Sequence, residues 1–279
     1  MISKVLGAVL LVFFMGVRTL SVGAETRPSV ADFLGQVQAT YDKMQSYSSV
    51  GDVISDISTP NLGQIDSHHT FSMKLARPNL YRVEWELHAP YIDSSGAVWS
   101  AGDGNFVVAP GLAGPTRPKD MSTALSMATG LSGGAAATIP AIFFGLSFNA
   151  LKAGNDAAFK PDSDIEGDAC YVIAEKTGTV GVTMWISKKS KLLRQIREDF
   201  NGSTKMPEMT DEEARKVLES MGWATTAEAI KDTKAQMTSM RSMMSSGMSG
   251  FSIQVQRKIV LNATLHKADF TTHPSPASK

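Results

Sequence analysis

Cysteine is almost absent from this sequence, because Cys170 is the only one among 279 residues. A single cysteine cannot form an intramolecular disulfide, even in a compartment that permits one. Free cysteine is among the most buried residue types, and it usually behaves as a small hydrophobic side chain. We therefore expect Cys170 to lie in the core.

An excess of charge of one sign is also missing, since 27 Lys and Arg residues balance 27 Asp and Glu residues. Residues 1–24 contain Lys4 and Arg18 and no acidic residue, so the remaining chain has 25 basic and 27 acidic side chains. A nearly neutral chain has no electrostatic reason to bind nucleic acid or an anionic membrane surface. The predicted partners therefore exclude nucleic acid.

No apolar run is long enough to span a bilayer comfortably. Residues 5–17 are apolar, Lys4 precedes them, and Val22, Gly23 and Ala24 are small enough for a cleavage site. These features predict a secretory signal peptide over residues 1–24, followed by a single soluble periplasmic domain over 25–279. The alternative is an uncleaved membrane anchor, which Arg18 and the absence of a later stop-transfer segment disfavour.

Catalytic and metal-binding motifs are scarce as well. Gly130-Leu131-Ser132-Gly133-Gly134 matches the Gly-x-Ser-x-Gly spacing of a nucleophile elbow, but a helical pattern precedes it where that motif needs a strand. The histidines show no His-x-x-x-His spacing and have no second cysteine as a partner. We predict no catalytic residue, no metal site and no cofactor, and hence no enzyme.

The clearest pattern that is present is a β-hairpin over residues 65–87. Apolar and polar side chains alternate with period 2 on both sides of the turn Arg77-Pro78-Asn79. Proline fixes φ and cannot donate to a strand ladder, so it belongs between two strands. The second strand carries Tyr81, Val83 and Trp85 on one face and charged residues on the other.

Further alternating runs surround this hairpin, and no crossover helix separates the first five strands. The patterns predict an antiparallel, mainly β fold of the α+β class, with about nine to eleven strands. A helix is expected over residues 29–44, and strands at 50–58, 97–101, 105–109, 169–176, 180–186, 192–200 and 253–265.

Residues 111–154 interrupt the strands with a helical pattern at 121–131 and an apolar run at 139–148. This lid segment is too long and too apolar for a surface loop, so we expect it to lie across the mouth or the concave side of the sheet.

A helical insertion is predicted over residues 201–250, between the last two strands. Thr210 and Glu213 form a helix-start signature, and a second helix carries a methionine-rich stripe beginning at Ile230. Methionine is flexible and polarizable, so this stripe could serve an adaptable binding surface for an envelope protein. The alternative, which is favoured for any amphipathic helix, is packing onto the sheet.

Five stretches resemble the LolA/LolB-like superfamily of periplasmic lipoprotein carriers. They are YDKMQSYSS, FSMKLARPNLYRVEWE, SSGAVWSAGDGN, IEGDACYVI and MWISKKSKLLRQI. Within this superfamily the sequence is most similar to a branch of periplasmic proteins without assigned activity. The resemblance implies a curled incomplete β-barrel around a helical lid, with an apolar cavity for acyl chains. It also implies an arginine that holds the lid, for which Arg82 and Arg257 are candidates by strand position.

These features predict a periplasmic binding or carrier protein that holds a hydrophobic ligand, either a lipid or the acyl chains of a lipoprotein. The alternative is a non-enzymatic envelope sensor or protein-interaction module on the same scaffold. The predicted ligand-binding residues form a wall on the hairpin, made of Phe71, Met73, Tyr81, Val83 and Trp85, and a lid, made of Phe143, Phe144, Leu146 and Phe148.

Overall fold

The computed structural model describes residues 27–60, 63–89, 92–110, 114–152, 154, 156–203 and 207–271. The signal peptide predicted for residues 1–24 lies outside these ranges. No helix in the described part of the chain is long and apolar enough to cross a bilayer.

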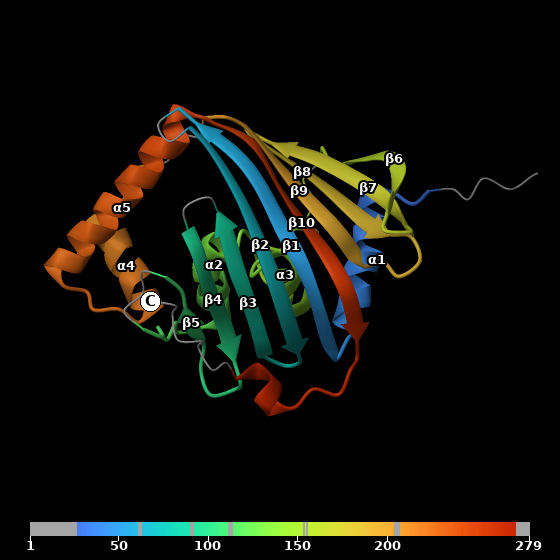
Figure 1. Cartoon of the computed structure of the whole chain (residues 1–279), viewed down its shortest axis with the longest axis horizontal. Coiled ribbons are helices and arrows are strands. Elements are labelled where there is room, and N and C mark those ends of the chain that lie inside the picture. The colour runs from blue at the N-terminus through green and yellow to red at the C-terminus, as the bar shows by residue number, and fades with distance from the viewer. Residues whose placement is uncertain are drawn as a thin grey trace, which may run out of the picture.

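Ten strands form one antiparallel sheet in the order β5-β4-β3-β2-β1-β10-β9-β8-β7-β6. The first and last strands of the chain pair at its centre, and β5 and β6 are its two edges. The sheet curls into an open half-barrel (Figure 1), which confirms the predicted fold class. The strands are β1 (Ser46–Thr59), β2 (Gly63–Ala76), β3 (Leu80–Ala89), β4 (Ile92–Ser100), β5 (Phe106–Val108), β6 (Ala158–Ile165), β7 (Asp168–Thr177), β8 (Val180–Ser187), β9 (Leu193–Gly202) and β10 (Met248–Leu261).

The sequence patterns identified every strand except β6. This strand is at the sheet edge, none of its residues is buried, and Pro161 lies within it. An edge strand without a buried face needs no alternation, and an edge tolerates proline because one side of the strand makes no ladder bonds. The missing pattern therefore follows from the position of β6.

In the described part of the chain, five α-helices and one short 3₁₀ helix accompany the sheet. The N-terminal helix α1 begins after Ser29, whose side chain accepts a hydrogen bond from the Asp32 amide at 3.1 Å, as an N-cap does. Phe33, Val37 and Tyr41 lie on its buried face. The helices are α1 (Val30–Asp42), α2 (Met121–Leu131), α3 (Thr138–Phe144), α4 (Asp211–Met221), α5 (Ala227–Ser246) and η1 (Lys267–Phe270).

The lid segment connects the two edges of the sheet, because β5 precedes it and β6 follows it. Nine inter-strand spacings separate these edges along the sheet, which is roughly 43 Å at about 4.8 Å each. The chain crosses this width on the concave side, where α2 and α3 lie against the sheet (Figure 1). The predicted placement of the lid segment is confirmed.

The hairpin of β2 and β3 shows why one face of the sheet holds the core. Tyr81, Val83 and Trp85 are buried against the lid, whereas Arg82 and Glu84 lie between them in the sequence and point to the convex side. Alternation with period 2 therefore separates an apolar concave face from a polar convex face.

Helices α4 and α5 lie between β9 and β10 and extend beyond the β5 edge of the sheet (Figure 1). Thr210 and Glu213 form the predicted capping box at the start of α4. Helix α5 packs mainly on α4, and among its described side chains Ile230 is the buried one. The prediction that this helix packs onto the sheet is therefore wrong. The side chains of Met240 and Met244 in the predicted stripe lie outside the description.

Candidate functional site

The five predicted wall residues come together on the concave face of β2 and β3. None of their side chains is more than 4% exposed. Phe71 and Met73 lie opposite Trp85 and Val83 in the antiparallel register. The wall is therefore one continuous apolar surface, built from cross-strand pairs.

Two glycines make room for the aromatic rings of this wall. Gly51 of β1 lies opposite Phe71, and a Cβ atom at Gly51 would lie 2.4 Å from that ring. Gly96 of β4 lies opposite Trp85, and a Cβ atom there would lie 2.3 Å from the indole. Real Cβ contacts are longer than these distances. Any other residue at Gly51 or Gly96 would therefore force the aromatic ring or the backbone to move.

The lid side chains occupy the concave space in front of the wall. Phe143 is fully buried, and Phe144 and Leu146 are half-buried against the same core. The rings of Tyr81 and Phe144 have centroids 6.3 Å apart, which is direct contact between wall and lid. Phe148 is 37% exposed and lies beyond the buried cluster. The lid thus fills the concavity in this structure.

Arg77 holds the C-terminal end of the lid helix α3. Its guanidinium donates hydrogen bonds to the carbonyl oxygens of Phe143 at 2.7 Å, Met44 at 3.0 Å and Tyr41 at 3.3 Å. The guanidinium carbon also lies 4.7 Å from the centroid of the Phe143 ring. A charged donor on the last carbonyls of a helix satisfies acceptors that the helix itself leaves open.

The two arginines suggested from the sequence do not contact the lid. Arg82 pairs with Glu84 and lines a hollow on the convex face, and Arg257 pairs with Asp52 and Glu166. Both side chains point away from the concave face, because both positions alternate with buried ones. The role of Arg77 could not be predicted from strand alternation, because Arg77 belongs to the turn Arg77-Pro78-Asn79, where alternation assigns a residue to neither face of the sheet.

Gln38 of α1 provides a second connection to the lid. Its side-chain amide donates to the Ile142 carbonyl at 3.1 Å and to Asp42 at 2.8 Å. Asn149, which follows the lid helix, donates from its side-chain amide to Gln38 Oε1 at 2.6 Å. We call Arg77 and Gln38 together the latch, since both bind backbone carbonyls at the end of α3.

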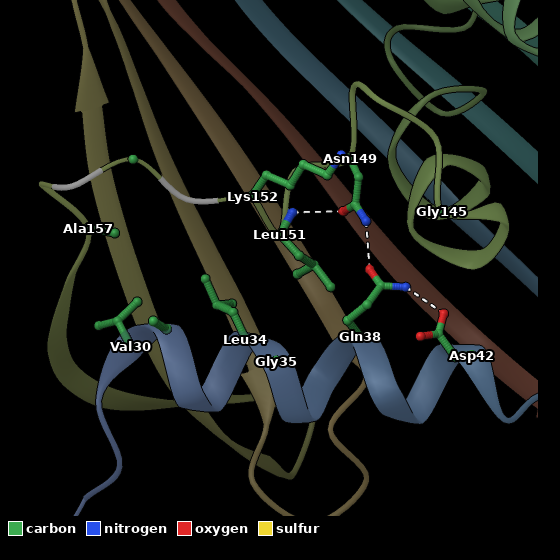
Figure 2. A pocket seen from close by; sticks show the side chains of 12 residues that line it. Val30, Leu34, Gly35, Gln38, Asp42, Gly145, Asn149, Leu151, Lys152 and Ala157 are labelled. Atoms are coloured by element: carbon green, nitrogen blue, oxygen red, sulfur yellow. Dashed lines mark hydrogen bonds between the residues drawn. The ribbon is translucent and has the colours of Figure 1, made fainter.

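A groove of about 690 Å³ lies beside the latch, between α1 and the chain that follows α3. Figure 2 shows Leu34 and Gln38 pointing from α1 toward Leu151 and Asn149. This volume lies within the range of small-molecule sites, about 300–1,000 Å³. No pattern in the sequence indicated this groove. Its lining combines apolar and polar residues, namely Val30, Ala31, Leu34, Gly35, Gln38, Asp42, Gly145, Asn149, Leu151, Lys152, Gly154 and Ala157.

Polar side chains from two strands, β10 and β2, interrupt the apolar concave face. Gln254 and Gln256 of β10 are 4% and 1% exposed, and His69 of β2 is 6% exposed. Alternation along the predicted strand 253–265 would put Ile253, Val255 and Ile259 on one face. This expectation is wrong, because a β-bulge opposite Ser49 shifts the register of β10 there. The glutamines, together with Ile259, therefore face the core, and Ile253 and Val255 point outward.

Hydrogen bonds satisfy these polar groups only in part. Thr138 of the lid donates to the Gln254 carbonyl oxygen at 2.8 Å, and Ser49 donates to the Gln256 carbonyl oxygen at 2.8 Å. The Nε2 atoms of both glutamines and Nδ1 of His69 have no hydrogen-bond partner within the described ranges. Burial, followed by the nearby charges of His68 and His88, lowers the pKa of His69. Each unpaired buried group costs about 1–3 kcal/mol.

Ser132 does not form a nucleophile elbow. Helix α2 precedes it, its hydroxyl donates to the Thr129 carbonyl at 3.2 Å, and the same oxygen accepts from the Ala136 amide at 3.0 Å. The fully buried hydroxyl thus stabilises the turn between α2 and α3. Among the described residues no group of three His, Cys, Asp or Glu side chains is placed to bind a metal.

Cys170 is buried in β7, as predicted for a lone cysteine. Burial raises the pKa of its thiol to about 11, so the thiolate is scarce at neutral pH. The side chain therefore acts as a small hydrophobe.

No family model matches the sequence, and no curated protein matches it. Several solved structures are similar to this chain. A DUF1329 family protein from Desulfovibrio piger has 13% identity and a TM-score of 0.34, and the match covers 87% of this chain and 95% of that one. A LolA superfamily protein from Nitrosomonas europaea has 10% identity and a TM-score of 0.31, covering 88% and 99%.

LprF from Mycobacterium bovis has 8% identity and a TM-score of 0.39, and the match covers 86% of this chain and 96% of that one.

Proposed function

We propose that this chain is a periplasmic binding or carrier protein, which holds a lipid or the acyl chains of a lipoprotein on the concave face of its sheet. The lid carries this proposal. It is a segment outside the sheet that covers an apolar wall, and its end is held by a few polar contacts at the latch. A ligand would take the place that the lid occupies here.

Burial of an acyl chain would contribute a large free energy to such an exchange. Each buried methylene contributes about 0.8 kcal/mol, so an acyl chain of sixteen carbons contributes roughly 12 kcal/mol. The hydrogen bonds from Arg77 to backbone carbonyls contribute about 1.5–3 kcal/mol each. An acyl chain can therefore offset the loss of the hydrogen bonds that Arg77 makes.

The proposed ligand-binding residues are those predicted from the sequence. Phe71, Met73, Tyr81, Val83 and Trp85 form the wall, and Phe143, Phe144, Leu146 and Phe148 form the lid. The groove beside the latch is the proposed entrance, because it lies next to the carbonyls that Gln38 and Arg77 bind. Periplasmic location follows from the signal peptide predicted for residues 1–24.

Energy transfer from Trp85 to a bound fluorescent fatty acid tests this proposal. Trp85 is part of the wall, whereas Trp223, after the end of α4, is 38% exposed. We expect transfer that survives Trp223→Phe and falls sharply in Trp85→Phe. Lipid extraction of protein purified from the periplasm, followed by mass spectrometry, should recover an acyl lipid. Protein without lipid that also fails to bind the probe would contradict the proposal.

The exposure of α5 favours a second candidate function, a sensor or interaction module. A helix of 20 residues that packs mainly on α4 leaves most of its surface available to another protein. In this case the lid would remain closed, and the concave face would be an ordinary core.

A further inference from the structure

Two amide groups beneath the lid are buried with their donors unused. Gln254 and Gln256 are at least 96% buried, and the Nε2 atom of each lacks an acceptor in the part of the chain that the structure describes. Both carbonyl oxygens accept a hydroxyl hydrogen bond, from Thr138 and Ser49 respectively. In both residues the group without a partner is therefore the N–H donor of the side-chain amide.

The register places these donors within the proposed ligand site. Gln256 lies opposite Gly51, which is also the partner of the wall residue Phe71, and Gln254 lies opposite Val53. The two glutamines are two positions apart on one strand face, so their Cα atoms are roughly 7 Å apart. On the other side of Val53 lies His69, whose buried Nδ1 also has no hydrogen-bond partner among the described residues.

The lid covers this group of polar residues at the turn between its two helices. Thr138 begins α3 and binds Gln254, and a Cβ atom at Gly133 would lie 2.9 Å from His69 Nδ1. Displacement of the lid removes Thr138 from Gln254. Opening therefore exposes hydrogen-bonding groups in the middle of an apolar wall.

We propose that Gln254 and Gln256 bind the carbonyl oxygens of acyl ester or amide groups, so that the ligand is a neutral acylated lipid rather than a bare hydrocarbon. This inference rests on the function proposed above and specifies its ligand class. Ester and amide carbonyls supply acceptors at the head of an acyl chain, next to the apolar part that the wall would cover. A carboxylate is a poorer match, because a buried charge needs a paired cation.

The experiment compares two ligands with the same chain, methyl palmitate and hexadecane, as competitors for a fluorescent acyl probe. The variant is Gln254→Leu with Gln256→Leu, and the matched control is Gln195→Leu. Gln195 lies on β9 opposite Val255, hence on the other face of the sheet. We expect the double variant to lose roughly tenfold to a hundredfold in affinity for the ester, and less than threefold for hexadecane, while the control keeps both affinities.

A second measurement does not depend on how the variant folds. The side-chain amide signals of Gln254 and Gln256 in wild-type protein should shift when the ester binds, and stay in place with hexadecane. The inference would be overturned if the ester and hexadecane bound equally well, if the double variant kept both affinities, and if the amide signals did not shift. The carrier function would remain intact in that case. Binding of neither ligand to the wild type would instead contradict the carrier function itself.

Discussion

At the scale of single residues, the aromatic wall depends on glycines in the strands beside it. The rings of Phe71 and Trp85 cover the positions where Gly51 and Gly96 lack a Cβ atom. Both glycines sit in strand interiors, where glycine is ordinarily unfavourable. Their role is therefore to bring a ring close to the neighbouring backbone.

We expect Gly96→Ala to destabilise the protein by about 1–3 kcal/mol, because the new methyl group overlaps the indole of Trp85. Thermal unfolding should show a lower Tm. The matched control is Gly35→Ala on the exposed side of α1, where a Cβ atom meets nothing within 4 Å. This control should stabilise the helix by about 0.5–1 kcal/mol. Equal effects of the two variants would contradict the steric explanation.

His69 makes stability depend on pH. Its pKa in the folded protein is lowered, mainly by burial, so the unfolded chain binds the proton more tightly. Stability should therefore fall as the pH drops from about 6.5, the value in unfolded chains, toward the lower folded value.

The His69→Leu variant should lose this slope in denaturant titrations between pH 7 and 5, whereas His266→Gln, at an exposed position, should keep it. A slope that persists unchanged in His69→Leu would show that other groups cause it.

At the scale of elements, the latch decides how firmly the lid is closed. Arg77 is the residue that joins the lid helix α3 to the end of α1 and to the following backbone at Met44. Lysine keeps the charge but cannot reproduce a planar fork of donors. The geometry of the guanidinium is therefore part of the latch.

We expect Arg77→Lys to weaken the lid by about 2 kcal/mol, seen as faster hydrogen exchange of residues 138–148. The control is Arg82→Lys, which changes the same residue type on the convex face of the same hairpin. Exchange in the lid should stay unchanged in the control. If hydrogen exchange in residues 138–148 were identical in the wild type and in Arg77→Lys, Arg77 would not contribute to holding the lid.

We expect the sheet to fold without the insertion, which in the structure is the connection between β9 and β10, residues 203–247. Gly202 and Met248 are a register pair, so the two ends of residues 203–247 lie side by side. Its contacts with the rest of the chain include a hydrogen bond from the Lys119 amide to the Ser220 carbonyl at 3.2 Å and the approach of α4 to α2.

Replacing residues 203–247 with Asn-Gly should make a β9–β10 hairpin and preserve cooperative unfolding. Probe binding should also survive if the concave face is the ligand site. Loss of probe binding in a folded deletion variant would place the ligand on the insertion, and loss of a bound partner alone would support the interaction function.

At the scale of the whole molecule, topology explains why the lid exists. The sheet grows outward in both directions from the central pair β1 and β10, so the chain must cross from β5 at one edge to β6 at the other. The crossing covers the apolar face that the alternation of the strands creates. A single connection thus shields the wall, and its helices α2 and α3 belong to no strand pair of the sheet.

A bound acyl ligand should stabilise the whole domain. At a ligand concentration of 100 Kd the gain is about 2.7 kcal/mol, measurable as a rise in Tm. Hydrogen exchange should slow in β1, β2 and β3 and quicken in residues 138–148, because the ligand replaces the lid. Slower exchange in both regions would indicate binding with the lid still closed, as in the groove beside α1.

From the order of residues alone one can predict the strand alternation, the turn at Arg77-Pro78-Asn79, the helix Met121–Leu131 and the apolar character of the lid. These features depend on neighbouring residues and on a periodicity of 2 or 3.6, which a linear pattern contains. The wall residues could be identified for the same reason, because one face of a half-buried strand is apolar.

Three features depend on how distant parts of the chain pack together: Arg77 binds the lid, β6 forms an edge, and Gln254 and Gln256 face inward. Arg77 contacts residues 66 positions away, which no local pattern encodes. In β10 a single bulge exchanges the two faces of the strand, so the apolar residues point outward and the amides point in. The chemistry beneath the lid therefore depends on strand register, which is set by pairing with a strand from the other end of the chain.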